Sequence, residues 1–266
     1  MFTALYEVWA TATAVSALPE PALTGGALAV GTALTLQPHA WRVARHGLTL
    51  VHEASHAAVG LCVGRRVVGI RLNWNTSGTT TTTGKPRGFG RLLTTAAGYP
   101  GPGVAAVGIA TLTGVGRPAL ALALVAVASA LVTVMSRNLW GLLVAATATA
   151  LAYTALTRGG VQGVALGTTA LAALLAAGSL RCCMELAAAH GRRGELEGER
   201  PGDRRKRSGR EQAAAEQGEG SDADTLAAIA LLPARVWVAL FGAICAVSCW
   251  AVVGALTLVP GPAALL

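Results

Sequence analysis

The sequence predicts an all-α polytopic membrane protein with about six transmembrane helices and one small strand-like hairpin. Hydrophobic residues make up 53% of the 266 residues and charged residues only 13%, whereas charged residues form about a quarter of an ordinary soluble domain. Apolar stretches rich in Ala, Leu, Val and Gly recur along the chain, and small residues let membrane helices pack closely. The third observation is a short region in which apolar and polar residues alternate with the period of a strand.

The apolar stretches define the expected helices in chain order. Residues 22–36 are short for a crossing, which takes about 20 residues, and Trp41 then marks a turn at the membrane interface. The later stretches cover residues 43–63, 89–112, 119–135, 139–156 and 161–180, and a last one lies within 225–258. We therefore expect a membrane core over residues 22–186 and a second membrane part over residues 222–258.

The remaining segments are polar or too short to cross a membrane. Residues 1–21 contain two glutamates and no basic residue, which is unlike a signal peptide, so we expect this N-terminal segment to be retained. Residues 187–221 mix arginines with glutamates and glycines, a composition typical of a disordered, solvated loop. Residues 259–266 form a C-terminal tail.

The strand-like hairpin is expected over residues 67–84. Apolar side chains alternate with polar ones in its first half: Ile70, Leu72 and Trp74 with Arg71, Asn73 and Asn75. Its second half is a run of threonines, which have a high propensity for strands. The alternative interpretation is a polar loop outside the membrane.

The most informative motif is H-E-x-x-H at His52, Glu53 and His56, within the apolar stretch 43–63. Residues four apart share one face of a helix, so both histidines can bind a single zinc ion. Glu53 can then act as general base on a water molecule held by the metal. Ionisable groups are rare in membrane helices unless they are paired or ligated, so the placement favours a hydrolytic zinc site within a membrane. The alternative is a polar cluster hydrogen-bonded within the bundle.

A catalytic zinc ion usually has three protein ligands, so one more is needed. Asp222 is our choice and Asp224 the alternative, because both lie at the start of a late apolar segment. If one of them ligates, the other can orient His52 or His56. Either aspartate can instead be a simple helix cap.

A second break in the helical pattern is the Gly/Pro-rich run at 98–103. Broken backbone at membrane depth occurs where it is buried in protein or lines a cavity, so this break borders the active site or is a simple turn between helices. We assign substrate binding to side chains of the hairpin and of this break: Ile70, Leu72, Trp74, Gly98 and Pro100.

Together these features resemble the site-2 protease family of intramembrane zinc metalloproteases, most closely a short bacterial branch without a PDZ domain. The resemblance covers residues 43–113 and 221–245 and implies His52 and His56 as zinc ligands and Glu53 as the base. The usual L-D-G motif of the third ligand is absent, and Ser221-Asp222-Ala223 looks like its substitute. The resemblance implies hydrolysis of peptide bonds in transmembrane substrate proteins and a location in the bacterial plasma membrane.

Basic residues predict the orientation. If residues 187–221 are cytoplasmic, alternation of the spans places most other basic residues on the same side: Arg65, Arg66, Arg71, Lys85, Arg87, Arg91 and Arg137. This places the N-terminus in the cytoplasm as well. The net charge of +8 then reflects cytoplasmic loops, and because no basic patch is interleaved with aromatic residues, we expect no nucleic-acid partner.

Two other functions use the same residues. A metal or proton transporter could bind its cargo transiently at the histidines, although such pathways usually carry ionisable residues along several spans. A catalytically inactive scaffold could retain the fold and bind partner helices. Glu53→Gln separates these functions, because a protease loses cleavage but keeps zinc, whereas a transporter or scaffold can keep its activity.

Overall fold

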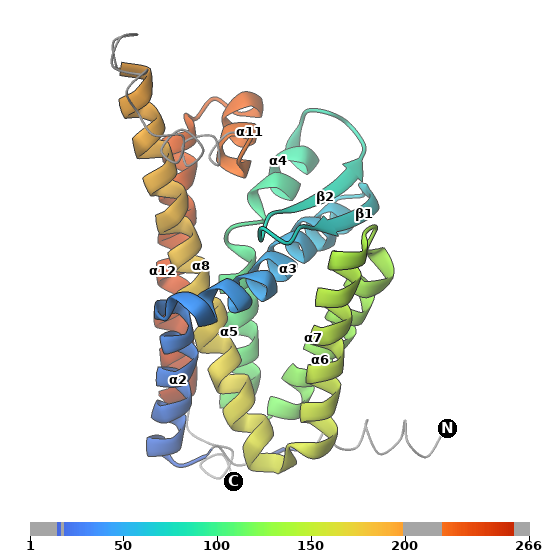
Figure 1. Ribbon diagram of the computed structural model, residues 1–266, viewed down its shortest axis with the longest axis vertical. Coiled ribbons are helices and arrows are strands. Elements are labelled where there is room, and N and C mark those ends of the chain that lie inside the picture. Colours follow the sequence, from blue (N-terminus) through green and yellow to red (C-terminus); the bar gives the residue numbers. More distant parts are fainter. Residues whose placement is uncertain (1–14, 17–18, 199–219, 258–266) are drawn as a thin grey trace.

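Helix α3 (Pro38–Cys62) carries the H-E-x-x-H motif and runs obliquely across the molecule, with the other elements arranged around it (Figure 1). The computed structural model describes residues 15–16, 19–198 and 220–257. The other elements, in chain order, are α2 (Pro21–Leu36), β1 (Arg66–Leu72), β2 (Gly78–Thr83), α4 (Phe89–Ala96), α5 (Gly101–Gly114), α6 (Pro118–Met135), α7 (Leu139–Arg158), α8 (Gly160–Gly198), α11 (Asp222–Ile229) and α12 (Ala234–Thr257).

Local chemistry explains where α3 begins and ends. The Gln37 side chain accepts a hydrogen bond from the Ala40 backbone N–H, and Pro38 occupies the first helical position, where its missing N–H is not needed. At the other end Gly64 has φ +74°, a left-handed conformation that glycine adopts without strain. The chain therefore reverses immediately after α3 and enters strand β1 beside it.

Helices α2, α5, α8 and α12 form one packed group. Its core contains mainly small and aliphatic side chains, including Ala106, Ala110, Ala172 and Val252. A Cβ atom on Gly31 of α2 would lie 2.2 Å from the main-chain oxygen of Ala170 in α8, so this contact requires glycine. Close approach through small residues is the usual way in which helices pack in membranes.

Four helices among the described residues are long and apolar enough to cross a membrane: α6, α7, α8 and α12. Helices α2 and α5 are apolar but have only 16 and 14 residues. Helix α3 has 25 residues but carries arginines and histidines along its length, and it does not qualify as a span. The expected count of about six spans is therefore not confirmed.

The break expected at the Gly/Pro-rich run is present, whereas one expected helix boundary was wrong. The stretch 89–112 is divided into α4 and α5 at this run, because Pro100 and Pro102 cannot donate the backbone hydrogen bonds of a continuous helix. Helix α8 continues to Gly198 rather than ending near residue 186. Its extension begins with three alanines, which are strong helix formers. The rest of the predicted loop, residues 199–219, lies outside the described residues, as do most of residues 1–21 and the tail 258–266.

The expected hairpin is confirmed as an antiparallel pair of strands, β1 and β2. One face of β1 is buried: Ile70 and Leu72 are 0% and 1% exposed and pack with Leu50 of α3 and Val132 of α6. The outer edge of β1 is covered, since Arg137 N–H donates to the Ile70 carbonyl and the Asn138 amide bonds both main-chain groups of Leu72. Among the described residues, no backbone hydrogen bond from another segment reaches the outer edge of β2.

Candidate metal centre

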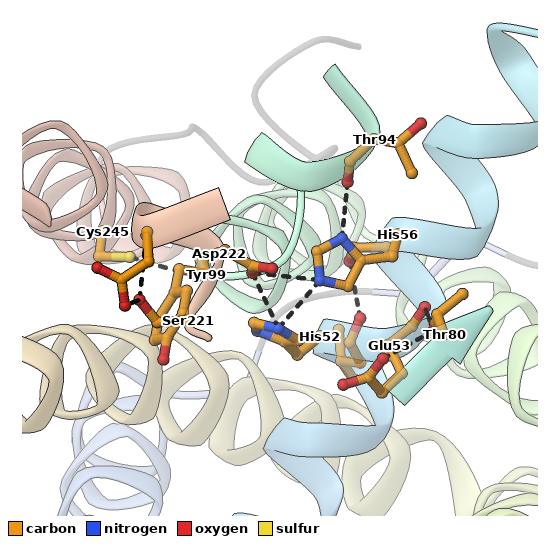
Figure 2. Close-up of polar contacts among 12 residues, drawn as sticks. His52, Glu53, His56, Thr80, Thr94, Tyr99, Ser221, Asp222 and Cys245 are labelled. Carbon is orange, nitrogen blue, oxygen red and sulfur yellow. Dashed lines mark hydrogen bonds and ion pairs between the residues drawn. The ribbon is translucent and has the colours of Figure 1, made fainter. Parts of the chain in front are cut away.

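Three side chains from two distant elements meet at one point (Figure 2). His52 Nε2 and His56 Nε2, both on α3, lie 3.1 Å apart. The Oδ2 atom of Asp222, at the start of α11, lies 3.2 Å from each of these nitrogens. These three are the one group of metal-binding side chains of this kind among the described residues. The structure thus brings Asp222 to the two histidines of the motif.

The spacing of these atoms fits a metal ion. In a tetrahedral zinc site with metal–ligand distances of about 2.0–2.1 Å, two ligand atoms are about 3.3 Å apart, close to the 3.1–3.2 Å separations observed. Asp222 Oδ2 is buried and makes no well-formed hydrogen bond. Two ring nitrogens and a carboxylate oxygen aimed at one point repel one another unless a cation lies between them.

Gly98 leaves the space that an ion would occupy. A Cβ atom at this position would lie 2.4 Å from Asp222 Oδ2, 2.5 Å from His56 Nε2 and 2.6 Å from His52 Cε1. Any side chain here would therefore enter the space between the three ligands. The break between α4 and α5 borders the metal centre, as one of the two interpretations of the Gly/Pro-rich run anticipated.

A hydrogen bond to the ring nitrogen that faces away from the metal centre fixes the orientation of His56. Its Nδ1 lies 2.6 Å from the main-chain oxygen of Thr94 in α4, so Nδ1–H donates to that carbonyl. This hydrogen bond keeps the proton on Nδ1 and leaves the Nε2 lone pair free to bind a metal, an arrangement common at metal-binding histidines. His52 is held differently, because its ring packs edge-on against Tyr99 with 4.9 Å between the ring centroids.

Helix α11 positions Asp222 through its cap and its apolar face. The Ser221 hydroxyl accepts a hydrogen bond from the Asp224 backbone N–H and so caps the helix. Ala223 and Leu226 are fully buried and pack in a cluster with Phe241 of α12.

Asp224 points away from the metal centre. Residues two apart on a helix differ by about 200° in direction, and Asp224 instead lies 3.3 Å from His190 Nε2 and 3.6 Å from Arg193 Nη1, both on α8. The expectation that the second aspartate orients His52 or His56 was therefore wrong. Asp224 instead joins α11 to the extended end of α8.

Glu53 faces the same cavity as the metal centre. Its side chain is 4% exposed, and Oε2 accepts a hydrogen bond of 2.7 Å from Thr80 Oγ1 on β2 (Figure 2). The cavity has a volume of about 770 Å³ and is lined by residues of α3, β2, α4, α8 and α11. A carboxylate beside a metal-binding cavity can accept a proton from a molecule bound there.

The residues assigned to substrate binding lie in different surroundings. The side chains of Ile70 and Leu72 are buried in the core and do not line the cavity, so their position does not support this assignment. Their alternation marks the buried face of a strand. Trp74 is 80% exposed in the hairpin turn, Gly98 faces the metal centre, and Pro100 is buried at the start of α5.

Two contacts of the site were missed in the sequence. Thr94 acts through its main-chain oxygen, which any residue provides, so no residue type could have indicated it. Thr80 acts through its hydroxyl, and the signal available was the period of two in the threonine run: Thr80 and Thr82 face inward, whereas Thr79, Thr81 and Thr83 are exposed.

Comparison with known proteins identifies one family. The family model described as Peptidase M50B-like matches residues 26–252. No curated protein and no solved structure matches the chain. The matched region contains both histidines, Glu53 and Asp222, and the apolar helices indicate an integral membrane protein. The chain therefore belongs to the Peptidase M50B-like family, the site-2 protease family of membrane metallopeptidases.

Proposed function

We propose that this protein is an intramembrane zinc metalloprotease that hydrolyses peptide bonds of transmembrane substrate proteins. The observation that carries the proposal is the convergence of His52, His56 and Asp222, with Glu53 beside them in one cavity. Nitrogen and carboxylate ligands in this number are typical of catalytic zinc sites, which keep one position open for reactants.

The residues have distinct roles in this proposal. His52, His56 and Asp222 would hold zinc, which would act as a Lewis acid on the substrate carbonyl and would make the attacking water easier to deprotonate. The Glu53 carboxylate accepts a proton from the attacking water and returns it to the leaving amine. Thr94 keeps the His56 proton on Nδ1, and Thr80 holds the Glu53 carboxylate.

A transmembrane substrate must expose a peptide bond before it can be hydrolysed. In a helix the carbonyl is already bonded and shielded, so the segment must unwind, and its backbone groups then need new partners away from water. The outer edge of β2 offers such partners, and Gly78, Thr80 and Thr82 of this strand line the cavity. An extended segment that adds to β2 as a third strand satisfies its own backbone groups.

The orientation follows from charge. We place the protein in the bacterial plasma membrane with residues 187–221 in the cytoplasm, because basic residues concentrate on the cytoplasmic side of membrane proteins. The expected cytoplasmic N-terminus is not retained, because the Ser16 N–H donates to the Gly116 carbonyl at the turn between α5 and α6, and α2 begins at the end of the molecule opposite to the end of α8 (Figure 1). Within the described residues there is one group of metal-binding side chains, which favours a single reaction centre over the series of sites that a transporter needs.

The test is an unbiased comparison of membrane proteins in cells that express either the wild-type chain or Glu53→Gln. We expect new cleavage fragments of transmembrane proteins with the wild type only, while both proteins bind zinc equally. Fragments that form equally with both would contradict Glu53 as the base. If His56→Ala contained no zinc and still produced the same fragments as the wild type, zinc catalysis would be contradicted.

A further inference from the structure

Strand β2 contacts the Glu53 carboxylate at two points. Thr80 Oγ1 lies 2.7 Å from Glu53 Oε2 and 2.9 Å from the Glu53 main-chain oxygen, so one hydroxyl bonds both the side chain and the backbone of this residue. A Cβ atom on Gly78 would lie 2.5 Å from Glu53 Oε1 and 2.7 Å from Glu53 Cγ. The carboxylate therefore rests directly on the backbone of β2, and only glycine at position 78 permits this.

Thr80 has no substitute in this role among the described residues. It makes the one side-chain hydrogen bond to the Glu53 carboxylate in that part of the chain. A buried carboxylate that loses its hydrogen-bond donor is left without a partner, which costs free energy. The carboxylate is then no longer held in this orientation. The branched threonine side chain has few rotamers, so the position of β2 determines the position of the hydroxyl.

The same strand has the free edge of the sheet. The outer edge of β1 is covered by Arg137 and Asn138, whereas no backbone hydrogen bond from another described segment reaches the outer edge of β2. A substrate segment that adds to this sheet must therefore pair with β2. The strand that would receive the substrate is also the strand that holds the base.

We propose that Thr80 is a positioning residue for Glu53, and that β2 thereby links substrate docking to the orientation of the base. An extended substrate on the outer edge fixes β2, and the Thr80 hydroxyl transmits that fixed position to the carboxylate. This inference rests on the proposed function, because the orientation of Glu53 matters only if Glu53 acts on a bound reactant.

The first test measures binding and needs no substrate. A peptide hydroxamate binds zinc through two oxygen atoms and hydrogen-bonds a neighbouring carboxylate, so its affinity reports the position of Glu53. We compare Thr80→Val, Thr80→Ser and Thr81→Val in the zinc-loaded full chain, each with and without Glu53→Gln. Thr81 is exposed on the opposite face of the same strand and receives the same chemical change.

We expect Thr80→Val to weaken hydroxamate binding roughly tenfold or more, the usual effect of losing a hydrogen bond to a charged group. Thr80→Ser restores the affinity, and Thr81→Val leaves it unchanged. In the Glu53→Gln background, Thr80→Val adds little, because the two residues act as one unit. Zinc content stays the same throughout. An equal loss from Thr80→Val in both backgrounds, or no loss at all, overturns the proposal.

The second test uses a substrate identified by the comparison of wild type with Glu53→Gln. Thr80→Val and Gly78→Ala should lower kcat with KM nearly unchanged, since the docking edge of β2 remains while the base is displaced. A rise in KM alone would assign β2 to docking only and overturn the link. If the hydroxamate affinity does not depend on Glu53 and no Glu53-dependent fragment exists, the proposed function itself fails, which is a distinct result.

Discussion

The metal centre has two halves with different origins. The first half, His52, Glu53 and His56, lies within two turns of α3 and needs only the geometry of one helix. The second half comes from elements distant in sequence: Asp222 of α11, the Thr94 carbonyl of α4 and the space at Gly98. The comparison teaches that a local motif supplies two ligands and a base, whereas the tertiary fold adds the third ligand, the hydrogen bond that orients His56 and the space for the metal.

The largest effect is expected from the first half. His56→Ala removes one of the two nitrogen ligands, so we expect zinc binding to be lost and proteolysis with it. The measurement is zinc per protein by elemental analysis after purification. His46→Ala is the control, because His46 lies on the same helix and contacts only the Trp140 ring among aromatic groups. Full zinc content in His56→Ala would mean that α3 does not provide the site.

The strongest test of the second half is Gly98→Ala. The added methyl group would lie within 2.4–2.6 Å of all three ligand residues, so we expect zinc affinity to fall sharply while the helices remain folded. Gly108→Ala on α5 is a matched control, since nothing lies within 4 Å of its Cβ position. Competition with a zinc chelator gives the affinity. Equal affinities for the two alanine variants would show that the space at Gly98 is not needed.

The two aspartates of α11 sharpen the comparison further. Loss of a residue that only hydrogen-bonds a metal ligand typically lowers metal affinity by roughly 10–100-fold. Asp222 is itself a proposed ligand, so we expect Asp222→Ala to lower zinc affinity by at least this factor. Asp224→Ala should have a smaller effect, because it only loosens the attachment of α11 to His190 and Arg193. A chelator titration of both variants ranks them. The opposite ranking would assign the third ligand to Asp224.

The smallest effect on the metal should come from the hairpin core. Ile70→Val removes one buried methylene group and should lower the free energy of unfolding by about 0.5–1.5 kcal/mol, with zinc content unchanged. Val68, which is 47% exposed on the same strand, provides the control Val68→Ala. Thermal unfolding in detergent measures both. A change in substrate affinity without a change in stability would return Ile70 to the substrate-binding residues.

The sequence predicted the parts of the molecule that depend on neighbouring residues. The motif helix followed from spacing and composition, the hairpin followed from alternation, and the family was suggested by resemblance. All three agree with the structure and the comparison. The division of 89–112 at its prolines could also be anticipated. The choice of Asp222 over Asp224 could not be made from spacing alone, because both aspartates precede the same apolar segment.

What could not be predicted depends on contacts between distant elements. The hydrogen bond from His56 to the Thr94 carbonyl involves a main-chain atom, and every residue type has such an atom, so the sequence could not indicate it. Ile70 and Leu72 have the alternation of a strand, but only the packed structure shows that their face meets α3 and α6 rather than the cavity. The number of spans also depends on tertiary structure, since the short apolar helices α2 and α5 pack against α8 although they have only 16 and 14 residues.

The most direct test of the central claim is X-ray absorption spectroscopy at the zinc edge of the purified full-length protein. We predict one zinc ion per chain with two imidazole nitrogens and carboxylate oxygen in its first shell, at about 2.0–2.2 Å, and loss of the aspartate contribution in Asp222→Ala. A sulfur shell near about 2.3 Å, or a spectrum that is identical in Asp222→Ala, would contradict the joining of α3 and α11 through one metal ion.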